Sequence, residues 1–128
     1  MLKVVRGATG GPSGRADDTF TGEAWRDRIF GPDVADGVAV GNMFFTPGAR
    51  THWHSHVGGQ LLVILAGSGY VADEDGVVEA SAGDAVWAPP GVRHWHGASA
   101  GRSMLHMAVT IGETDWLEPV TDDEYPRG

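Results

Sequence analysis

The six histidines of the chain fall in three short segments. One segment, THWHSH, carries histidines at alternate positions, and a later one, RHWHG, repeats the arrangement. Alternate residues of a β-strand point to the same face, so each segment presents its imidazoles on one side if it is extended. Imidazole is the commonest metal ligand at neutral pH and suits zinc, copper, iron and nickel. The pattern indicates a metal site shared between strands. The histidines are His52, His54 and His56 in the first segment, His94 and His96 in the second, and His106 alone.

The composition is that of one folded domain. The chain has 128 residues, of which 41% are hydrophobic and 20% charged, enough for a single core. The absence of cysteine excludes disulfides, thiolate catalysis and cysteine-based zinc sites. A net charge of −8 with scattered Lys and Arg argues against nucleic acid and leaves a small molecule as the expected partner. There is no long apolar run and no secretory signal pattern, so we expect no membrane association and a cytoplasmic location.

Short extended segments separated by turn residues make up most of the chain. The run QLLVILAG is continuous and apolar, which predicts a strand buried on both faces, and Gly67 to Gly69 are expected to end it. Asp75-Gly76 is a hairpin signal. Together the segments predict an all-β sandwich or barrel. Strands are expected at 38–46, 60–67, 70–74, 77–80, 84–88 and 103–111.

The two ends of the chain differ from this pattern. Residues 1–18 are rich in glycine and polar residues, and we expect a flexible arm before a single domain at 19–128. Residues 19–30 are expected to form an N-terminal edge strand. The segment TDDEY at 121–125 predicts a short C-terminal helix with Thr121 as its N-cap.

The glycines and prolines around the histidines have a recognisable spacing. It resembles the two motifs of the cupin superfamily, G-x5-H-x-H-x3,4-E-x6-G and G-x5-P-x-G-x2-H-x3-N. The resemblance covers residues 48–98 and implies a double-stranded β-helix, the cupin jelly-roll barrel. Gln60 replaces the usual glutamate of the first motif, and Ala98 replaces the asparagine of the second. The matching positions are Gly48, His54, His56, Gln60 and Gly67, then Gly83, Pro89, Gly91 and His94.

The resemblance implies one divalent transition metal per chain. A glutamine adds no charge to the ligand shell, so the ion keeps its full formal charge and is a stronger Lewis acid. The alternative is that Gln60 disrupts the site and leaves a metal-free binding barrel. Ligand type alone does not select the ion, because Mn, Fe, Zn, Ni and Co all accept these donors. The implied ligands are His54, His56, Gln60 and His94.

A closer resemblance is to a subgroup of small bacterial cupins. The stretches PGARTHWHSHVGGQLLVILAGSGYV and GDAVWAPPGVRHWHGA are similar to segments of this subgroup. It includes manganese-dependent hydroxynitrile lyases and cupins associated with carboxymuconolactone decarboxylases, so the resemblance favours manganese, and glutamine is the usual fourth ligand there. It implies that His96 is the general base and that His106 lines the pocket as a second catalytic candidate. Thr110 stands where the lyases carry a glutamine. This departure from the lyases argues against cyanohydrin chemistry in particular.

Three functions are compatible with these residues. The first is a redox-neutral lyase, isomerase or decarboxylase, in which the metal stabilises charge on a substrate oxygen and His96 moves a proton. The second is an Fe(II)-dependent dioxygenase. The third is a non-catalytic binding or sensing barrel, although His96 and His106 exceed what a structural metal needs. A packing role for His96 is the alternative to catalysis.

Strand alternation suggests further positions around the site. Met43, Phe45, Met104 and Thr110 are candidate pocket residues, with ordinary core packing as the alternative. His52 shares the parity of the ligands but precedes the motif, and we expect it not to bind metal. Trp53 and Trp95 are expected outside the barrel or at an interface. Small cupins often pair through sheet contacts and the N-terminal strand, so a homodimer is expected.

Overall fold

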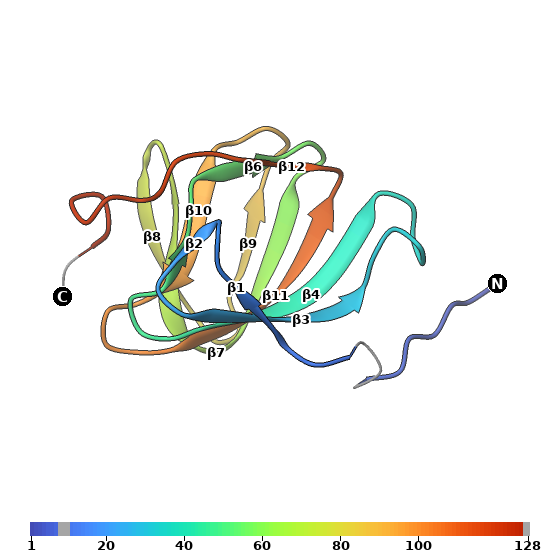
Figure 1. Cartoon of the computed structure of the whole chain (residues 1–128). Coiled ribbons are helices and arrows are strands. Elements are labelled where there is room, and N and C mark those ends of the chain that lie inside the picture. The colour runs from blue at the N-terminus through green and yellow to red at the C-terminus, as the bar shows by residue number, and fades with distance from the viewer. Residues whose placement is uncertain (8–10, 127–128) are drawn as a thin grey trace.

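The computed structural model describes residues 1–7 and 11–126, and its regular elements are all β-strands (Figure 1). Every pairing between strands is antiparallel. The strands close into a nearly complete barrel, which confirms the expected all-β fold. They are β1 (Gly14–Ala16), β2 (Phe20–Thr21), β3 (Ala24–Phe30), β4 (Val38–Phe45), β5 (Arg50–Thr51), β6 (His54–His56), β7 (Gln60–Asp73), β8 (Gly76–Ser81), β9 (Ala85–Ala88), β10 (His94–Ala98), β11 (Met104–Ile111) and β12 (Thr114–Trp116).

The long strand β7 belongs to both layers of the barrel. Its first half pairs with β9 and β11, and β11 continues through β4 and β3 to β1. Its second half pairs with β8 and β10, and β10 continues through β5 to β2. Figure 1 shows β4, β11 and β7 side by side, with β6 and β12 crossing one end of the barrel. That end holds the histidines.

The expected break at Gly67 to Gly69 is wrong, because β7 turns the corner between the two layers without ending. Gly67 has φ +74°, and a Cβ there would lie 1.9 Å from the carbonyl oxygen of Ser103. A Cβ on Gly69 would lie 2.1 Å from the carbonyl oxygen of Gly97. The glycines therefore permit a close approach of neighbouring strands.

The expectation that this strand is buried on both faces is also wrong. Leu62 and Ile64 point into the barrel and are 0% and 1% exposed, whereas Leu65 is 45% exposed. The inner face packs on Phe45 and Met104 in the main core. The apolar residues of the outer face are not covered by another layer of the described chain.

Residues 19–30 form two strands and not the single edge strand that we expected. β2 pairs with β5 in one layer, while β3 pairs with β4 in the other. Gly22 separates them with φ +81°, where a Cβ would come within 2.9 Å of the Ala49 Cα. β1 pairs with the outer side of β3, so residues 14–16 of the expected arm belong to the sheet.

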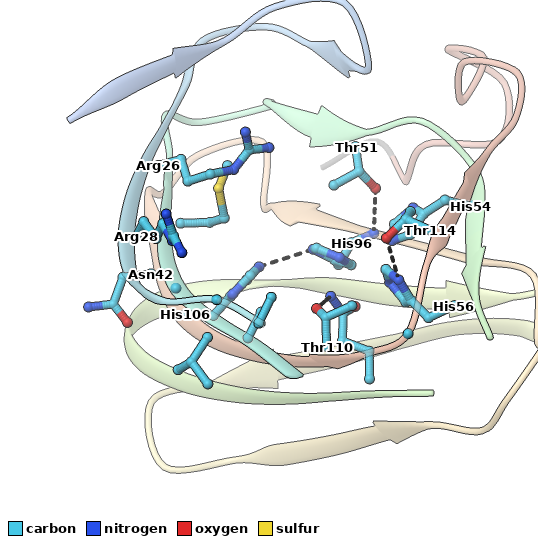
Figure 2. Close-up of a pocket in the computed structure, with 18 of the residues that line it drawn as sticks. Arg26, Arg28, Asn42, Thr51, His54, His56, His96, His106, Thr110 and Thr114 are labelled. Atoms are coloured by element: carbon cyan, nitrogen blue, oxygen red, sulfur yellow. Dashed lines mark hydrogen bonds between the residues drawn. The ribbon is translucent and has the colours of Figure 1, made fainter. Parts of the chain in front are cut away.

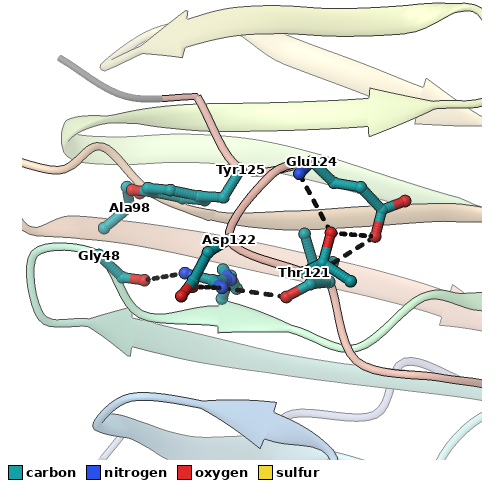
Figure 3. Close-up of polar contacts among 8 residues, drawn as sticks. Gly48, Ala98, Thr121, Asp122, Glu124 and Tyr125 are labelled. Atoms are coloured by element: carbon teal, nitrogen blue, oxygen red, sulfur yellow. Dashed lines mark hydrogen bonds and ion pairs between the residues drawn. The ribbon is translucent and has the colours of Figure 1, made fainter.

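The predicted C-terminal helix is absent from the described residues. Residues 121–125 form one turn, in which the Tyr125 amide donates to the Thr121 carbonyl oxygen at 3.0 Å. The Thr121 amide donates to the Glu124 carboxylate at 3.0 Å, and the Glu124 amide donates to the Thr121 hydroxyl at 3.2 Å, as in a capping box (Figure 3). Pro126 follows directly and disfavours helical geometry at the residue before it, so the turn does not extend. No described helix could cross a membrane.

Side-chain contacts hold the C-terminal segment, residues 120–125, against the layer that contains β5 and β10. The buried Arg50 guanidinium donates to the Val120 carbonyl at 3.0 Å and to Asp122 at 3.1 Å, and it lies 4.5 Å from the ring centre of Tyr125. The Tyr125 hydroxyl donates to the Ala98 carbonyl at 2.5 Å (Figure 3). Trp53 and Trp95 are buried beneath this segment, in a hydrophobic cluster separate from the main core.

Candidate metal centre

Three histidine rings converge at one end of the barrel. His54 and His56 lie on β6, and His94 begins β10 directly opposite His54 in the strand register. One ring nitrogen of each lies within 4.8 Å of the other two, and all three residues are buried. The ring centres of His54 and His94 are 4.3 Å apart. A single ion could be reached from all three rings.

Hydrogen bonds at the other ring nitrogens orient these imidazoles. Backbone carbonyl oxygens accept only, so Nδ1 of His54 and of His94 must carry the proton and Nε2 is left with its lone pair. The buried Nε2 of His56 has no hydrogen-bond partner among the described residues. His54 and His94 therefore have the tautomer that metal binding through Nε2 requires. The Nδ1 partners are the His52 carbonyl for His54 at 2.8 Å, the Val92 carbonyl for His94 at 3.0 Å, and the Thr114 hydroxyl for His56 at 2.9 Å.

Gln60 completes the cluster as the first residue of β7. Its amide oxygen lies 3.2 Å from Nε2 of His94, and its amide nitrogen donates to the Thr110 hydroxyl at 2.9 Å. In this orientation two lone pairs face each other with no proton between them. A shared cation would turn that repulsion into coordination, so the residues fit a divalent metal. Thr110 thus orients the Gln60 amide besides lining the pocket.

A second pair of imidazoles lies beside the cluster. Nε2 of His106 on β11 is 3.0 Å from Nδ1 of His96 on β10 (Figure 2). The other ring nitrogens, Nε2 of His96 and Nδ1 of His106, are buried without a hydrogen-bond partner among the described residues. The His96 ring centre is 5.2 Å from that of His54. His96 is therefore close enough to act on a molecule held at the cluster.

Burial keeps these imidazoles neutral. It lowers the pKa of His54 to about 2, with a further lowering by the nearby His94, and it lowers the pKa of His106 to about 4. Burial and then His94 lower the pKa of His56 to about 4. Burial also lowers the pKa of His94, and it lowers the pKa of His96 well below the usual value, with His106 contributing. Neutral imidazoles are the forms that bind metals or accept protons.

A pocket of about 360 Å³ opens over the cluster. Of the candidate pocket residues, Met43 and Thr110 line it. Phe45 and Met104 do not line it, because both are fully buried in the core. The Phe45 ring instead packs behind the imidazole pair, 5.3 Å from the ring centre of His106 and 5.9 Å from that of His96.

The sequence analysis missed several residues of the pocket wall. Thr114 and Trp116 come from β12, a three-residue strand that pairs with β6 and had no recognised signal. Arg26 and Arg28 come from β3 (Figure 2). Their alternate spacing in an expected strand was the available signal, because two such side chains share a face.

His52 does not belong to the cluster. The chain leaves strand geometry between β5 and β6, so its parity with His54 is lost. The His52 carbonyl orients the His54 ring instead.

Comparisons with known proteins agree with this geometry. The cupin domain model matches residues 41–111. The chain is 45% identical over 116 residues to an (R)-mandelonitrile lyase from Granulicella tundricola, covering 86% of this chain and 88% of that protein. The chain therefore belongs to the cupin family.

Two solved structures illustrate the likeness. A cupin-like protein from Thermotoga maritima has a TM-score of 0.84 and 35% identity, covering 94% of each chain. The polyketide cyclase RemF from Streptomyces resistomycificus has a TM-score of 0.75 and 22% identity, covering 98% of this chain and 91% of that one. The likeness to the second protein is one of fold alone.

Proposed function

We propose that this cupin is a metal-dependent, redox-neutral lyase acting on a small molecule with a hydroxyl or carbonyl oxygen. Cleavage of an aromatic cyanohydrin is the first reaction to test. The observation that carries the proposal is the position of His96, whose unpartnered Nε2 lies beside the three-histidine cluster in one pocket. The identity to a named mandelonitrile lyase supports the reaction class.

The residues divide into a binding set and a proton-transfer pair. His54, His56, Gln60 and His94 would hold a divalent transition metal, with manganese favoured by the resemblance. When bound, such an ion supplies a Lewis acid for an oxygen atom of the substrate. The neutral donors leave the charge of the ion undiminished, which distinguishes this site from one with a glutamate.

His96 would accept the hydroxyl proton of a cyanohydrin at Nε2. Its Nδ1 must then carry a hydrogen, which it donates to Nε2 of His106 across the 3.0 Å contact. As the proton leaves the hydroxyl, the C–C bond to the nitrile breaks and its electron pair departs with cyanide. The carbonyl forms, and cyanide takes up a proton to give aldehyde and hydrogen cyanide. His106 is proposed as a positioning residue because it fixes the tautomer of His96.

Turnover of racemic mandelonitrile by the manganese-loaded protein tests this proposal. Benzaldehyde and cyanide should form together and without oxygen, and His96→Phe should reduce kcat by at least about a hundredfold. His106→Phe should lower kcat more than it raises KM and should alter the pH profile of kcat, because no hydrogen bond with His106 then fixes the tautomer of His96. Oxygen consumption by iron-loaded protein with no anaerobic turnover would favour the dioxygenase instead.

We further propose a homodimer that forms through the outer face of the layer containing β3, β4, β7, β9 and β11. The proposal is supported by five large apolar residues on this face that are between 36% and 49% exposed. Exposed large apolar side chains gathered on one face of a sheet are typical of a protein contact. The residues are Trp25, Phe44, Leu65, Trp87 and Ile111.

A further inference from the structure

The pocket carries a positive charge that the proposed metal chemistry does not use. The chain has 17 acidic and 9 basic residues, excluding histidine. Nevertheless, the described lining of the pocket includes Arg26 and Arg28 and no aspartate or glutamate. The cluster below would add the charge of a divalent ion without a compensating carboxylate. Because Asp33 pairs with Arg28, Arg26 is the unneutralised positive charge of this wall, and together with a bound divalent ion it favours an anionic ligand.

The strand register places the arginines on the face of β3 that lines the pocket. Arg26 on β3 lies opposite Met43 on β4, and Met43 lies opposite His106 on β11. Residues opposite one another share a face, and Met43 and His106 are buried on the inner face. Two strand spacings, about 10 Å, separate the backbones of Arg26 and His106. Figure 2 shows Arg26 and Arg28 on the side of the pocket away from His54 and His56.

The two arginines differ in their availability. Arg28 donates to Asp33 at 2.6 Å, and its guanidinium packs over Gly31, where a Cβ would lie 2.5 Å away. Arg26 has no ion pair with any residue of the described ranges, and its guanidinium carbon lies 5.8 Å from the ring centre of Phe20. An arginine fork of this kind matches the two oxygens of a carboxylate. Arg26 is the stronger candidate for a ligand contact.

Several apolar side chains line the wall between these ends, beside the threonines Thr51, Thr110 and Thr114. Phe20, Phe30, Val40 and Met43 line it, and Trp116 lies against His54 with the ring centres 4.6 Å apart. A volume of about 360 Å³ admits a small aromatic molecule. The pocket therefore offers an oxygen-binding end, an apolar middle and a cationic end.

We infer that the substrate is a small aromatic or apolar acid, with its reacting hydroxyl or carbonyl at the histidine cluster and a carboxylate at Arg26. This inference rests on the proposed lyase function for the identity of the reacting end. It adds Arg26 as a specificity residue at the end of the pocket opposite the histidine cluster. Mandelonitrile has no carboxylate, so we do not expect it to be the best substrate.

Binding of matched ligands tests the inference without turnover. Calorimetry on the manganese-loaded protein would compare 4-formylbenzoate with the neutral 4-formylbenzamide at low salt. We expect the carboxylate to bind at least tenfold more tightly to the wild type, and Arg26→Gln to remove that preference while leaving the amide unchanged. Arg15→Gln is the control, because Arg15 is exposed, pairs with Asp17 and does not line the pocket.

Equal affinity for the two ligands, or no binding of either by metal-loaded protein, would overturn the inference. A preference that survives Arg26→Gln would also overturn it. A third ligand, 4-formylphenyl phosphate, separates the anion classes, and tighter binding of this phosphate would contradict a carboxylate site. Failure of the lyase proposal is a separate result, because it is judged by anaerobic cyanohydrin turnover and not by these affinities.

Discussion

Nε2 of His94 and the amide oxygen of Gln60 face each other across 3.2 Å. His94 holds its proton at Nδ1 against the Val92 carbonyl, and the Gln60 amide nitrogen is engaged by Thr110. With the Gln60 amide in this orientation both facing atoms are acceptors, an arrangement that costs free energy unless a cation coordinates both of them. The pair is the most specific structural argument for a metal at this site.

Changing Gln60 to glutamate should tighten metal binding and slow catalysis. A carboxylate adds a negative charge to the ligand shell, so the metal Kd should fall by about tenfold while kcat also falls. Competition with a fluorescent chelator would measure the Kd, and mandelonitrile turnover would measure kcat. Unchanged values of both would show that Gln60 is not a ligand.

Thr110→Val should weaken metal binding without removing a ligand. The variant keeps the shape of the side chain but loses the hydroxyl that accepts from the Gln60 amide. Loss of such an orienting bond typically costs 10–100-fold in affinity. The same titration would measure it, with Thr46→Val as the control because the Thr46 hydroxyl bonds the Glu23 carbonyl away from the pocket. Equal losses in both variants would contradict the assigned role.

The metal-free protein should lose stability as the pH falls below about 6.5. Burial lowers the pKa of His56 and of His106 to about 4, whereas these groups titrate near 6.5 once unfolded. The unfolded state then binds more protons between the two values, so acid favours unfolding by about 1.4 kcal/mol per pH unit for each such histidine. Above pH 6.5 this contribution should be flat.

Urea unfolding in the presence of a chelator, at pH 7.5, 6.5 and 5.5, would measure that dependence. Combined His56→Gln and His106→Gln substitutions should make the slope below pH 6.5 shallower without abolishing it, because burial also lowers the pKa of His54, His94 and His96. The same slope in the substituted protein would show that other groups cause the acid sensitivity.

Phe44→Glu should convert the proposed dimer into a monomer. Phe44 lies on the outer face, opposite Trp25 on one side and Leu105 on the other, and is 39% exposed. A charge there would be desolvated in a sheet-to-sheet contact. Light scattering after size exclusion would report the mass, and Val78→Glu on β8 is the control because it lies in the other layer. A monomeric wild type would refute the pairing.

Much of the fold could be predicted because turn residues and short extended segments are local signals. The metal cluster was predicted through the resemblance to the two cupin motifs, whose ligand positions are occupied here by His54, His56, Gln60 and His94. Gly67 was misread as the end of a strand, because glycine marks both turns and close backbone approaches, and only the approach of Ser103 separates these cases. The turn at Thr121 carries a helix-capping signal, but Pro126 prevents the helix that would follow.

The pocket wall was predicted less well, because it depends on contacts between distant strands. Phe45 has the same parity as Met43, but it lies deeper in the barrel, where it packs on the imidazoles. The alternate spacing of Arg26 and Arg28 predicts that they share a face, but only the register of β3 on β4 places that face at the pocket.

Metal content of protein purified without an affinity tag is the most direct test of the account. The wild type should hold close to one transition-metal ion per chain. His94→Ala should lose it, whereas His52→Ala should retain it because the contact that orients the His54 ring comes from the His52 backbone carbonyl, which the substitution keeps. Manganese would direct the assays to anaerobic lyase reactions, and iron to oxygen uptake. A wild type that neither carries metal nor takes it up on reconstitution would contradict the metal centre and the function built on it.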